Sequence, residues 1–526
     1  MPGWLDIHAR STTRYTTFEA LALHESISPD RWCVTRADLR HLRKEVRRAI
    51  QAGEIRPPDD GSHEFQSSDE LYGPSIYTVN TQHIMPVTEQ AGKVSWALMR
   101  HPDGLDCDLF ISHAWQEGVF EFLSKVLHSW PAGARHAWCC MLANPQNLDI
   151  GALLQSPSSS PFALALQASS CVLVVPNRHC SIYTRLWCSY EAYIAHQSGK
   201  VILVATSSTR RKLVFALLQN IALGLLGTLL AYLLRCRRHA DDSSQADHSI
   251  SVVALCLVII SLTASTTLQH QQCRAFLNRI GPLTSGFLMV HWDSVHSFPC
   301  MPGLSDHTSV LEQRVRLLMY AGFFYLLEVD RVNGQSKGEA AVQLQRGFQG
   351  SIKHAACSKP GDAARIHSEI GAQTEAVDYA IQVLLTAGMS TPTLRIVARA
   401  GVGIQDAGHA EIAVPFSVLV FLTFTGAWTL LEGSLHLHHA DLPLCLPLLG
   451  RVSLMVMIYR SAADARCFIM KMMTKLVAFY FVVLFPFLLS LEWAKKAFSQ
   501  PDSADLSDQA YASIVLLLAM CTFACL

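Results

Sequence analysis

The chain has 526 residues, and its 42 basic and 42 acidic side chains give a formal net charge of zero at pH 7. Half of the residues are hydrophobic and 16% are charged, against about 25% charged residues in an average soluble protein. This balance argues against nucleic acid as a partner attracted by overall charge, and it suits a protein with part of its chain in lipid.

Residues 1–104 are interpreted as a soluble leader, and their start has no apolar segment of the kind found in secretory signal peptides. Within the leader, residues 35–55 are predicted to form a helix, because apolar residues recur on one face and Thr35 can cap the first turn. The basic run at residues 40–48 is interpreted as a solvated helix face, with contact to anionic lipid as the alternative.

Residues 105–205 alternate short apolar strands with amphipathic helices. The predicted strands cover residues 107–112, 137–143, 171–176 and 200–205, and the predicted helices cover residues 117–130, 161–170 and 184–197. Continuous apolar strands separated by helices are typical of a parallel sheet that is covered on both faces. The sequence therefore predicts an α/β domain here.

A membrane region is predicted to follow. Residues 213–234 carry no charged side chain, and residues 250–268 are a second apolar run, so residues 213–268 are predicted to form a transmembrane hairpin. About four further spans are predicted within residues 413–526, at 414–431, 442–458, 476–491 and 511–526. The prediction is an all-α, multi-pass region behind the α/β domain.

Residues 269–412 lie between these groups of spans and are interpreted as a soluble, mostly helical module. The run "GFLMVHW" at residues 286–292 is a candidate extra strand, and residues 359–395 are predicted to form two helices joined at Gly371 and closed by Gly388. Arg210, Arg211 and Lys212 precede the first span, which indicates that the amino-terminal domain is cytosolic.

The 16 cysteines lack the regular spacing of a disulfide framework, so they are interpreted as reduced thiols. Because no CxxC pair occurs among them, no metal site is predicted. Ser112 and His113 stand together like a nucleophile and its base, but neighbours on a strand point to opposite faces, which argues against a hydrolase that uses this pair.

Two motifs in the α/β block resemble the Toll/interleukin-receptor-like (TIR) domain. "CDLFISHAW" at residues 107–115 is similar to the opening strand of the family. "SIYTRLWCSYE" at residues 181–191 is similar to its loop with Tyr183, followed by Trp187, Cys188 and Glu191. The whole arrangement also looks like multi-spanning TIR-like membrane proteins of single-celled algae.

The resemblance implies a fifth strand and two further helices after residue 205, where a predicted span begins instead. Either the domain is truncated, or "GFLMVHW" supplies the fifth strand from beyond the transmembrane hairpin.

Glu191 is the candidate site residue. Residues four apart share a helix face, so Glu191 is expected to lie over Trp187, where partial desolvation would raise the pKa of its carboxyl. The first turn of its helix, with Tyr183 and Arg185, is expected to line a cleft at the carboxyl ends of the strands.

Many TIR domains with a glutamate at this position cleave NAD at the nicotinamide–ribose bond, so the resemblance implies NAD as a substrate, with no resident cofactor assigned. A carboxylate can stabilise the positive charge that builds on the ribose carbon. Trp115 or Trp187 would stack on a flat ring, Arg185 would hold a phosphate and Tyr183 would donate a hydrogen bond. The alternative is that Glu191 pairs with Lys200 or Arg185 and that Trp187 belongs to the core.

Three functions remain open. The first is a membrane-anchored cytosolic signalling or interaction protein that associates with itself or with other TIR-like domains, as non-enzymatic TIR adaptors do. The second is an NAD hydrolase that uses Glu191. The third is a channel or transporter, for which Arg451 inside a predicted span is the clue.

Overall fold

The computed structural model describes residues 15–404, apart from residues 60, 62–64, 149–155, 238–249, 296–309, 358 and parts of 251–269. The spans predicted within residues 413–526, with Arg451, lie outside the described residues, and the span at 250–268 is only partly described. The chain divides into two units, Met1–Ser208 with Ser336–His409 and Thr209–Gln335 with Ala410–Leu526. Each unit is described by itself.

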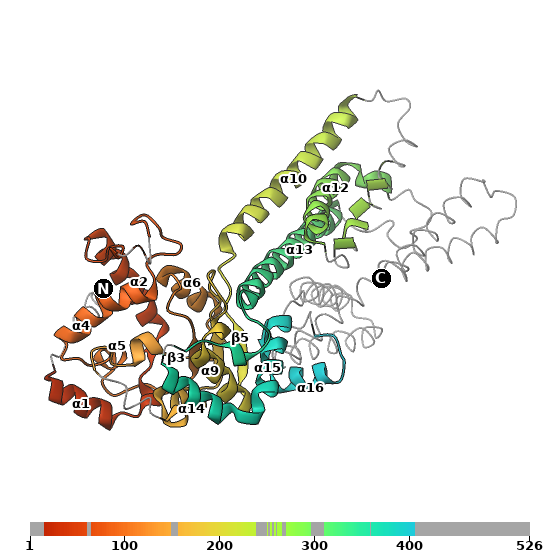
Figure 1. Ribbon diagram of the computed structural model, residues 1–526. Helices are drawn as coiled ribbons and strands as arrows, with labels where there is room; N and C mark the ends of the chain where they lie inside the picture. Colours follow the sequence, from red (N-terminus) through yellow and green to blue (C-terminus); the bar gives the residue numbers. More distant parts are fainter. Residues whose placement is uncertain are drawn as a thin grey trace, which may run out of the picture. The chain divides into compact units, whose positions relative to one another are not determined.

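The first unit is built on a six-stranded sheet with the strand order β1-β3-β2-β4-β5-β6. Figure 1 labels β3 and β5 of this sheet. The strands are β1 (Val34–Thr35), β2 (Leu109–Ser112), β3 (His136–Cys139), β4 (Cys171–Val174), β5 (Val201–Val204) and β6 (Met389–Ser390). The four central strands β3, β2, β4 and β5 are parallel, as predicted. Both edge strands are antiparallel to their neighbours, so the sheet as a whole is mixed.

Helices connect the parallel strands. They are α6 (Val119–Ser129), α7 (Cys140–Ala143), the 3₁₀ turn η4 (Pro157–Ser159), α8 (Pro161–Ala168), the 3₁₀ turn η5 (Ile182–Thr184) and α9 (Leu186–Gln197). The strand predicted at residues 137–143 is wrong in its second half, because residues 140–143 form α7. A short apolar run does not distinguish a strand from a turn of buried helix, and this run contains both.

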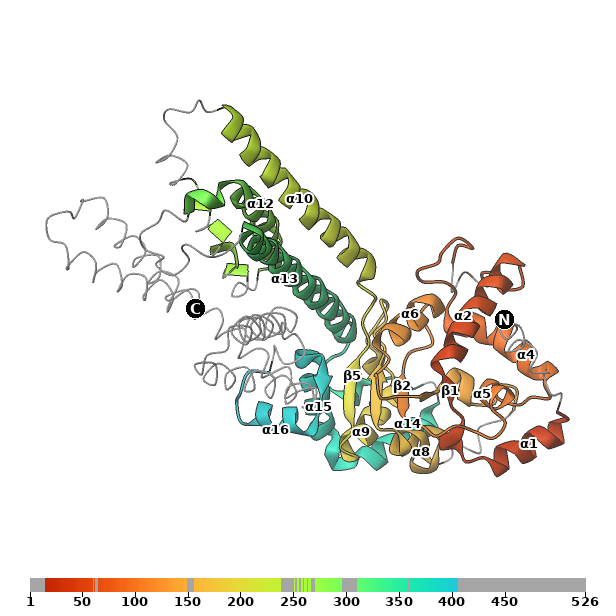
Figure 2. The ribbon, with the colours of Figure 1, turned by 180° about the vertical axis from the view of Figure 1, so that it is seen from behind.

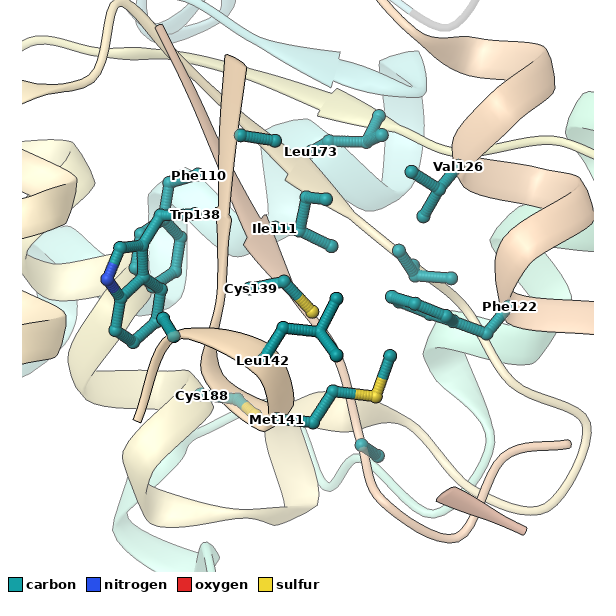
Figure 3. Close-up of a cluster of buried hydrophobic side chains, with 14 of the residues drawn as sticks. Phe110, Ile111, Phe122, Val126, Trp138, Cys139, Met141, Leu142, Leu173 and Cys188 are labelled. Atoms are coloured by element: carbon teal, nitrogen blue, oxygen red, sulfur yellow. The ribbon is translucent and has the colours of Figure 1, made fainter. Parts of the chain in front are cut away.

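The central strands place alternate side chains on opposite faces of the sheet. Phe110 and Trp138 stack on one face with ring centroids 5.1 Å apart. Figure 3 shows these two rings on the opposite side of the strands from Phe122 and Val126 of α6. The face with Phe110 is covered by α8 and α9, since Phe162 of α8 packs on both Trp138 and Trp187. Helices therefore cover both faces of the central sheet.

The amino-terminal segment packs into the same core. Its helices are α1 (Thr17–Ser26), η1 (Pro29–Arg31), α2 (Arg36–Gln51), α3 (Ile76–Val79), the π-helical turn η2 (Asn80–Ile84), α4 (Met85–Gln90) and α5 (Trp96–Arg100). The helix predicted at residues 35–55 is present as α2, and Thr35 caps it through a reciprocal capping box with Asp38. Trp32, Leu39 and Leu42 are fully buried in the core that surrounds the sheet.

The segment Ser336–His409 returns to this unit after the apolar region of the chain (Figure 2). It contains the end of α13 (Val310–Gln345), η6 (Ile352–His354), α14 (Pro360–Ile370), η7 (Gly371–Gln373), α15 (Thr374–Ala387), β6 and α16 (Pro392–Arg399). The two helices predicted around Gly371 are α14 and α15, and Gly388 closes the second in a left-handed conformation with φ of 69°. Such a backbone favours glycine.

The additional edge strand of the sheet comes from this returning segment. Ile202 of β5 pairs with Ser390, and Leu203 pairs with Met389. Residues 286–292, the candidate for that strand, lie instead inside the helix α12 (Gln271–Val295), so that prediction is wrong. Seven apolar residues are compatible with either structure, and here they continue a helical segment of 25 residues.

The second unit contains α10 (Arg210–Arg237), α12 and the first part of α13. Within the part of the chain that the structure describes, Arg210–Leu234 is the one helical stretch long and apolar enough to cross a membrane, and 11% of its most apolar window is buried. It contains the predicted span at residues 213–234. The multi-pass prediction is not supported by the described residues.

Glycines bring α10 and α12 together. A Cβ added at Gly227 would lie 1.9 Å from the Leu283 carbonyl oxygen, and one at Gly286 would lie 2.0 Å from that of Gly224. Thr228 Oγ1 donates to the Gly286 carbonyl at 3.1 Å. Small residues at a helix interface allow such backbone approach, a common arrangement between helices in lipid.

Candidate functional site

The candidate site lies at the carboxyl ends of β2 and β4. These strands are neighbours in the sheet, although β3 stands between them in the sequence, and β3 lies on the other side of β2. The connections that leave β2 and β4 therefore diverge to opposite sides, which is the topological switch point where open α/β sheets bind ligands. Ser112, at the end of β2, is the first polar side chain there.

Glu191 reaches this switch point from α9. Its side chain is buried, with 6% exposed, and one of its oxygens accepts a hydrogen bond from Ser112 Oγ. Burial raises the pKa of the Glu191 carboxyl to about 7, against the opposing effects of the Ser112 hydrogen bond and the positive charge of Arg185. A carboxyl in this state exchanges a proton near neutral pH, as groups at functional sites commonly do.

The alternative that Glu191 pairs with Lys200 is wrong. Lys200 Nζ donates to the backbone carbonyls of Gln167 and Ser169, at 2.7 and 2.5 Å, at the carboxyl-terminal end of α8. That cation stabilises the amino-terminal end of the strands, whereas Glu191 lies near their carboxyl end. Ser112 is the hydrogen-bond partner that the structure gives to Glu191.

Arg185 is the N-cap residue of α9 and is half-buried. Its charge lowers the pKa of Glu191 and of His113, so its guanidinium acts on the switch point electrostatically. The backbone beside it is held by the returning segment. Ala356 N donates to the Thr184 carbonyl at 2.7 Å, and Leu186 N donates to the Ala356 carbonyl at 2.9 Å. Arg185, the residue predicted to bind an anion, therefore lies near Glu191.

The predicted aromatic residues divide into two groups. Trp115 follows β2 and donates from Nε1 to Cys140 Sγ at 3.3 Å, so it stays at the carboxyl end of the sheet. Trp187 stacks on Phe162 of α8, with ring centroids 5.4 Å apart, and Tyr183 is 1% exposed against Phe348. Tyr183 and Trp187 therefore serve the packing of α9, which is the second of the two roles considered for Trp187.

Three polar residues at this edge were not among the predicted site residues: Ser112 itself, His113 and Glu117. His113 Nδ1 lies 3.4 Å from Glu117 Oε1, and both side chains are almost fully buried. Burial lowers the pKa of His113 to about 3 and raises the pKa of Glu117 well above its ordinary value. His113 is therefore neutral at pH 7, and its contact with Glu117 is not an ion pair.

Ser112 and His113 point to opposite faces of the sheet. Ser112 contacts Glu191 of α9, whereas the His113 ring packs on Phe122 of α6 with centroids 4.7 Å apart. This geometry confirms that the two side chains point to opposite faces, as neighbours on a strand do. The signal that could have found both residues was their position directly at the end of the first parallel strand.

Three thiols surround His113. Cys140 Sγ and Cys139 Sγ lie 3.2 and 3.6 Å from His113 Nε2, and Cys188 Sγ lies 3.6 Å from its carbonyl oxygen. Burial raises the pKa of Cys140 to about 12 and those of Cys139 and Cys188 well above the ordinary value, so the thiols stay protonated and unreactive. Among the described residues, no group of His, Cys, Asp or Glu side chains is arranged to hold a metal ion.

The arrangement supplies one carboxyl that titrates near neutral pH, a hydroxyl that donates to it and a cation nearby. Such a set can exchange one proton or stabilise one positive charge next to a bound ligand. No model of a known protein family matches the sequence, and neither a curated protein nor a solved structure matches it.

Proposed function

We propose that the chain is a multi-pass, membrane-anchored signalling or interaction protein whose TIR-like α/β unit works in the cytosol. The observation that carries this proposal is the junction between β5 and α10. β5 ends at Val204, and the apolar helix α10 begins at Arg210 with most of its large apolar side chains exposed. The five linking residues span at most about 17 Å, so the α/β unit stays close to whatever surface α10 enters.

Two observations support the TIR-like part of the proposal. The four parallel strands have the flavodoxin-like order of doubly wound sheets. The segment with Trp187, Cys188 and Glu191 forms the helix that leads to the switch point. The unit departs from the expected pattern at its last strand, which has two residues, runs antiparallel and follows α14 and α15.

Interaction is favoured over catalysis by the burial around α9. Tyr183 and Trp187 pack within the unit, and Glu191 is covered, so these residues offer little surface to a ligand. A rigid α/β unit held near a membrane is well suited to association with a second copy, since tethering raises the effective concentration of the partner.

The proposal is tested with full-length chains carrying donor and acceptor fluorophores, reconstituted together into liposomes. Energy transfer above that of randomly placed membrane proteins is expected, and adding excess unlabelled chain should abolish it. A control chain that lacks the whole α/β unit, residues 1–208 and 336–404, should show random transfer. Random transfer by the complete chain at every density would contradict the interaction function. Loss of the protein from membranes in alkaline wash would contradict the anchoring.

A second function, NAD hydrolysis, is favoured by one observation, the pKa of about 7 at Glu191 beside the switch point. The carboxylate would stabilise positive charge on the ribose carbon as the nicotinamide bond breaks. The full chain in detergent would then release nicotinamide from NAD, Glu191→Gln would abolish the release, and Glu89→Gln at the surface would leave it unchanged. No release at high, self-associating protein concentration would leave the interaction function alone.

A further inference from the structure

The helix α2 presents a row of four basic side chains to solvent. Arg36, Arg40, Lys44 and Arg48 are spaced four residues apart, and all four are exposed. Residues at this spacing share one helix face, and the row extends over 12 residues, or about 18 Å. These four residues are called the basic stripe. In a chain whose net charge is zero, they form a local concentration of one sign.

The orientation of the basic stripe is fixed by the opposite face of α2. Leu39, Leu42 and Val46 are fully buried in the core that surrounds the sheet. The helix start is held by Asp38, which accepts from the Thr35 backbone and contacts Arg100 and His101 at 3.1 and 2.7 Å. Rotation of α2 would expose this apolar face, so the basic stripe stays directed outward.

Two acidic residues on or beside α2 have partners outside the basic stripe. Glu45 contacts His41 at 3.0 Å, and Glu70 contacts Arg47 at 3.6 Å. Arg43 and Arg47 lie over the Phe120 ring at 5.8 and 5.9 Å and add positive charge at the side of the helix. The surface around α2 is therefore cationic, and it suits a partner with many negative charges.

We propose that the basic stripe binds the anionic lipid headgroups of the membrane that α10 enters. The inference depends on the membrane anchoring proposed above. The linker between β5 and α10 keeps the α/β unit near a bilayer at all times, so lipid phosphates are the anions present at the highest local concentration. Each basic side chain close to an anionic leaflet contributes about 1 kcal/mol, and the contribution falls off within a Debye length.

The experiment uses the full chain in nanodiscs of neutral phosphatidylcholine, with or without phosphatidylserine. Lys44 reports on the basic stripe through its reaction with an amine-specific reagent, and Lys93, which contacts Glu89, is the internal reference. Labelling of Lys44 is expected to fall several-fold in the anionic nanodiscs and to recover near 1 M salt, where the Debye length is about 3 Å. Equal labelling in both lipids would overturn the proposal.

The double variant Arg40→Gln/Arg48→Gln keeps Lys44 as the reporter. It leaves Arg36 in place, because Arg36 also donates to the Leu127 carbonyl. Removing two contributions of about 1 kcal/mol is expected to weaken binding to anionic lipid about 30-fold. Lys353→Gln/Lys359→Gln removes the same charge from exposed positions elsewhere in the unit and should leave the protection unchanged. Equal loss of protection in both variants would show only a general charge effect and would overturn the proposal.

The experiments distinguish failure of the proposed membrane anchoring from failure of the proposed lipid binding by the basic stripe. If the chain does not enter nanodiscs, the anchoring fails, and the stripe is then tested by sedimentation of the chain with anionic vesicles. Binding that depends on Arg40 and Arg48 would support the stripe on its own. Absence of vesicle binding, or binding of RNA as tight as that of vesicles, would overturn it.

Discussion

Residues 105–205 and the segment Ser336–His409 belong to the same α/β unit but enter it in different ways. The first stretch builds the four parallel strands from strand–helix units that follow one another along the chain. The second arrives after the whole of α10 and α12 and adds an edge strand and the helices α14, α15 and α16. The comparison teaches that a domain interrupted by an apolar helical region can be completed from beyond it.

The returning segment also forms hydrogen bonds with α9, the helix that carries Glu191, and with the residues just before it. Ser181 N donates to the Arg346 carbonyl at 2.7 Å, Ala356 bonds on both sides of Arg185, and Tyr190 donates to Glu369 at 2.8 Å. The local order of α9 therefore depends on residues more than 150 positions later in the chain. The predictions below test whether this dependence is structural.

The largest effect is expected from removing the returning segment. A chain of residues 1–208 should fail to form a monodisperse folded protein, whereas residues 1–208 joined to residues 336–404 by a flexible Gly/Ser linker should unfold cooperatively. The returning segment buries eight apolar side chains in the common core: Leu344, Ile352, Ile366, Ile370, Val377, Ile381, Leu384 and Leu385. Each contributes about 1.5–3 kcal/mol when buried, and the sum exceeds the net stability of a typical domain.

The measurement is thermal unfolding by circular dichroism together with gel filtration of both chains. Cooperative unfolding of residues 1–208 alone would show that the sheet does not need the returning segment. It would also break the comparison, because the first stretch would then be an independent domain.

A smaller effect is expected from single cavities placed in each region. Leu173→Ala in β4 and Ile381→Ala in α15 remove side chains that are 0% and 1% exposed. Both should cost about 2–5 kcal/mol, because each leaves a cavity in the same core. Hydrogen exchange of the β4 amides in the full chain reports both losses, and Ile396→Ala on the exposed side of α16 is the control. A loss of β4 protection only for Leu173→Ala would show that the returning segment does not contribute to the stability of the central strands.

The sequence predicted the elements of both regions but only part of their assembly. Strands such as Cys171–Val174 and the pair of helices around Gly371 are encoded by local apolar patterns and glycine positions. The pairing of β5 with β6 was missed, because a two-residue strand has no periodicity and its partner lies far along the chain. The apolar run at residues 286–292 was the more conspicuous candidate, and it is helical.

The candidate site shows the same division. Glu191 was found from its motif, and its raised pKa was expected from burial. Its partner Ser112 is 79 positions away, and their contact depends on how α9 packs on β2. Trp187 was expected beneath Glu191 by helical spacing. The spacing did not predict that its ring stacks on Phe162, because that contact depends on how α8 packs on α9.

Replacing Glu191 by Gln should stabilise the unit in a pH-dependent way. The fold raises the pKa of this carboxyl to about 7. Below its ordinary pKa the group is protonated in both states, so it has no effect. Between that value and about pH 7 the unfolded chain ionises first, so stability falls as pH rises. Above pH 7 the penalty is constant at about 3 kcal/mol, and a glutamine does not incur it.

Urea unfolding of the full chain in detergent, with hydrogen exchange of the β4 amides as the readout, should therefore show Glu191→Gln more stable than the native chain at about pH 8 and equal to it at about pH 4. Glu89→Gln, whose side chain is 54% exposed, should show no such difference. A variant that is destabilised at both pH values would mean that Glu191 is needed as a carboxylate for the fold.

The smallest effect concerns the contact between Tyr190 and the returning segment. Tyr190→Phe removes the hydroxyl that donates to Glu369 Oε1 at 2.8 Å and keeps the ring on Trp187. A hydrogen bond to a carboxylate at a partly covered position contributes about 1–2 kcal/mol, so faster hydrogen exchange is expected in α14, with little change in β4. Tyr193→Phe removes the same group from the next ring, 5.8 Å away, without touching Glu369. Equal acceleration of exchange in α14 by both variants would mean that the effect comes from losing either tyrosine hydroxyl, and not from losing the hydrogen bond to Glu369.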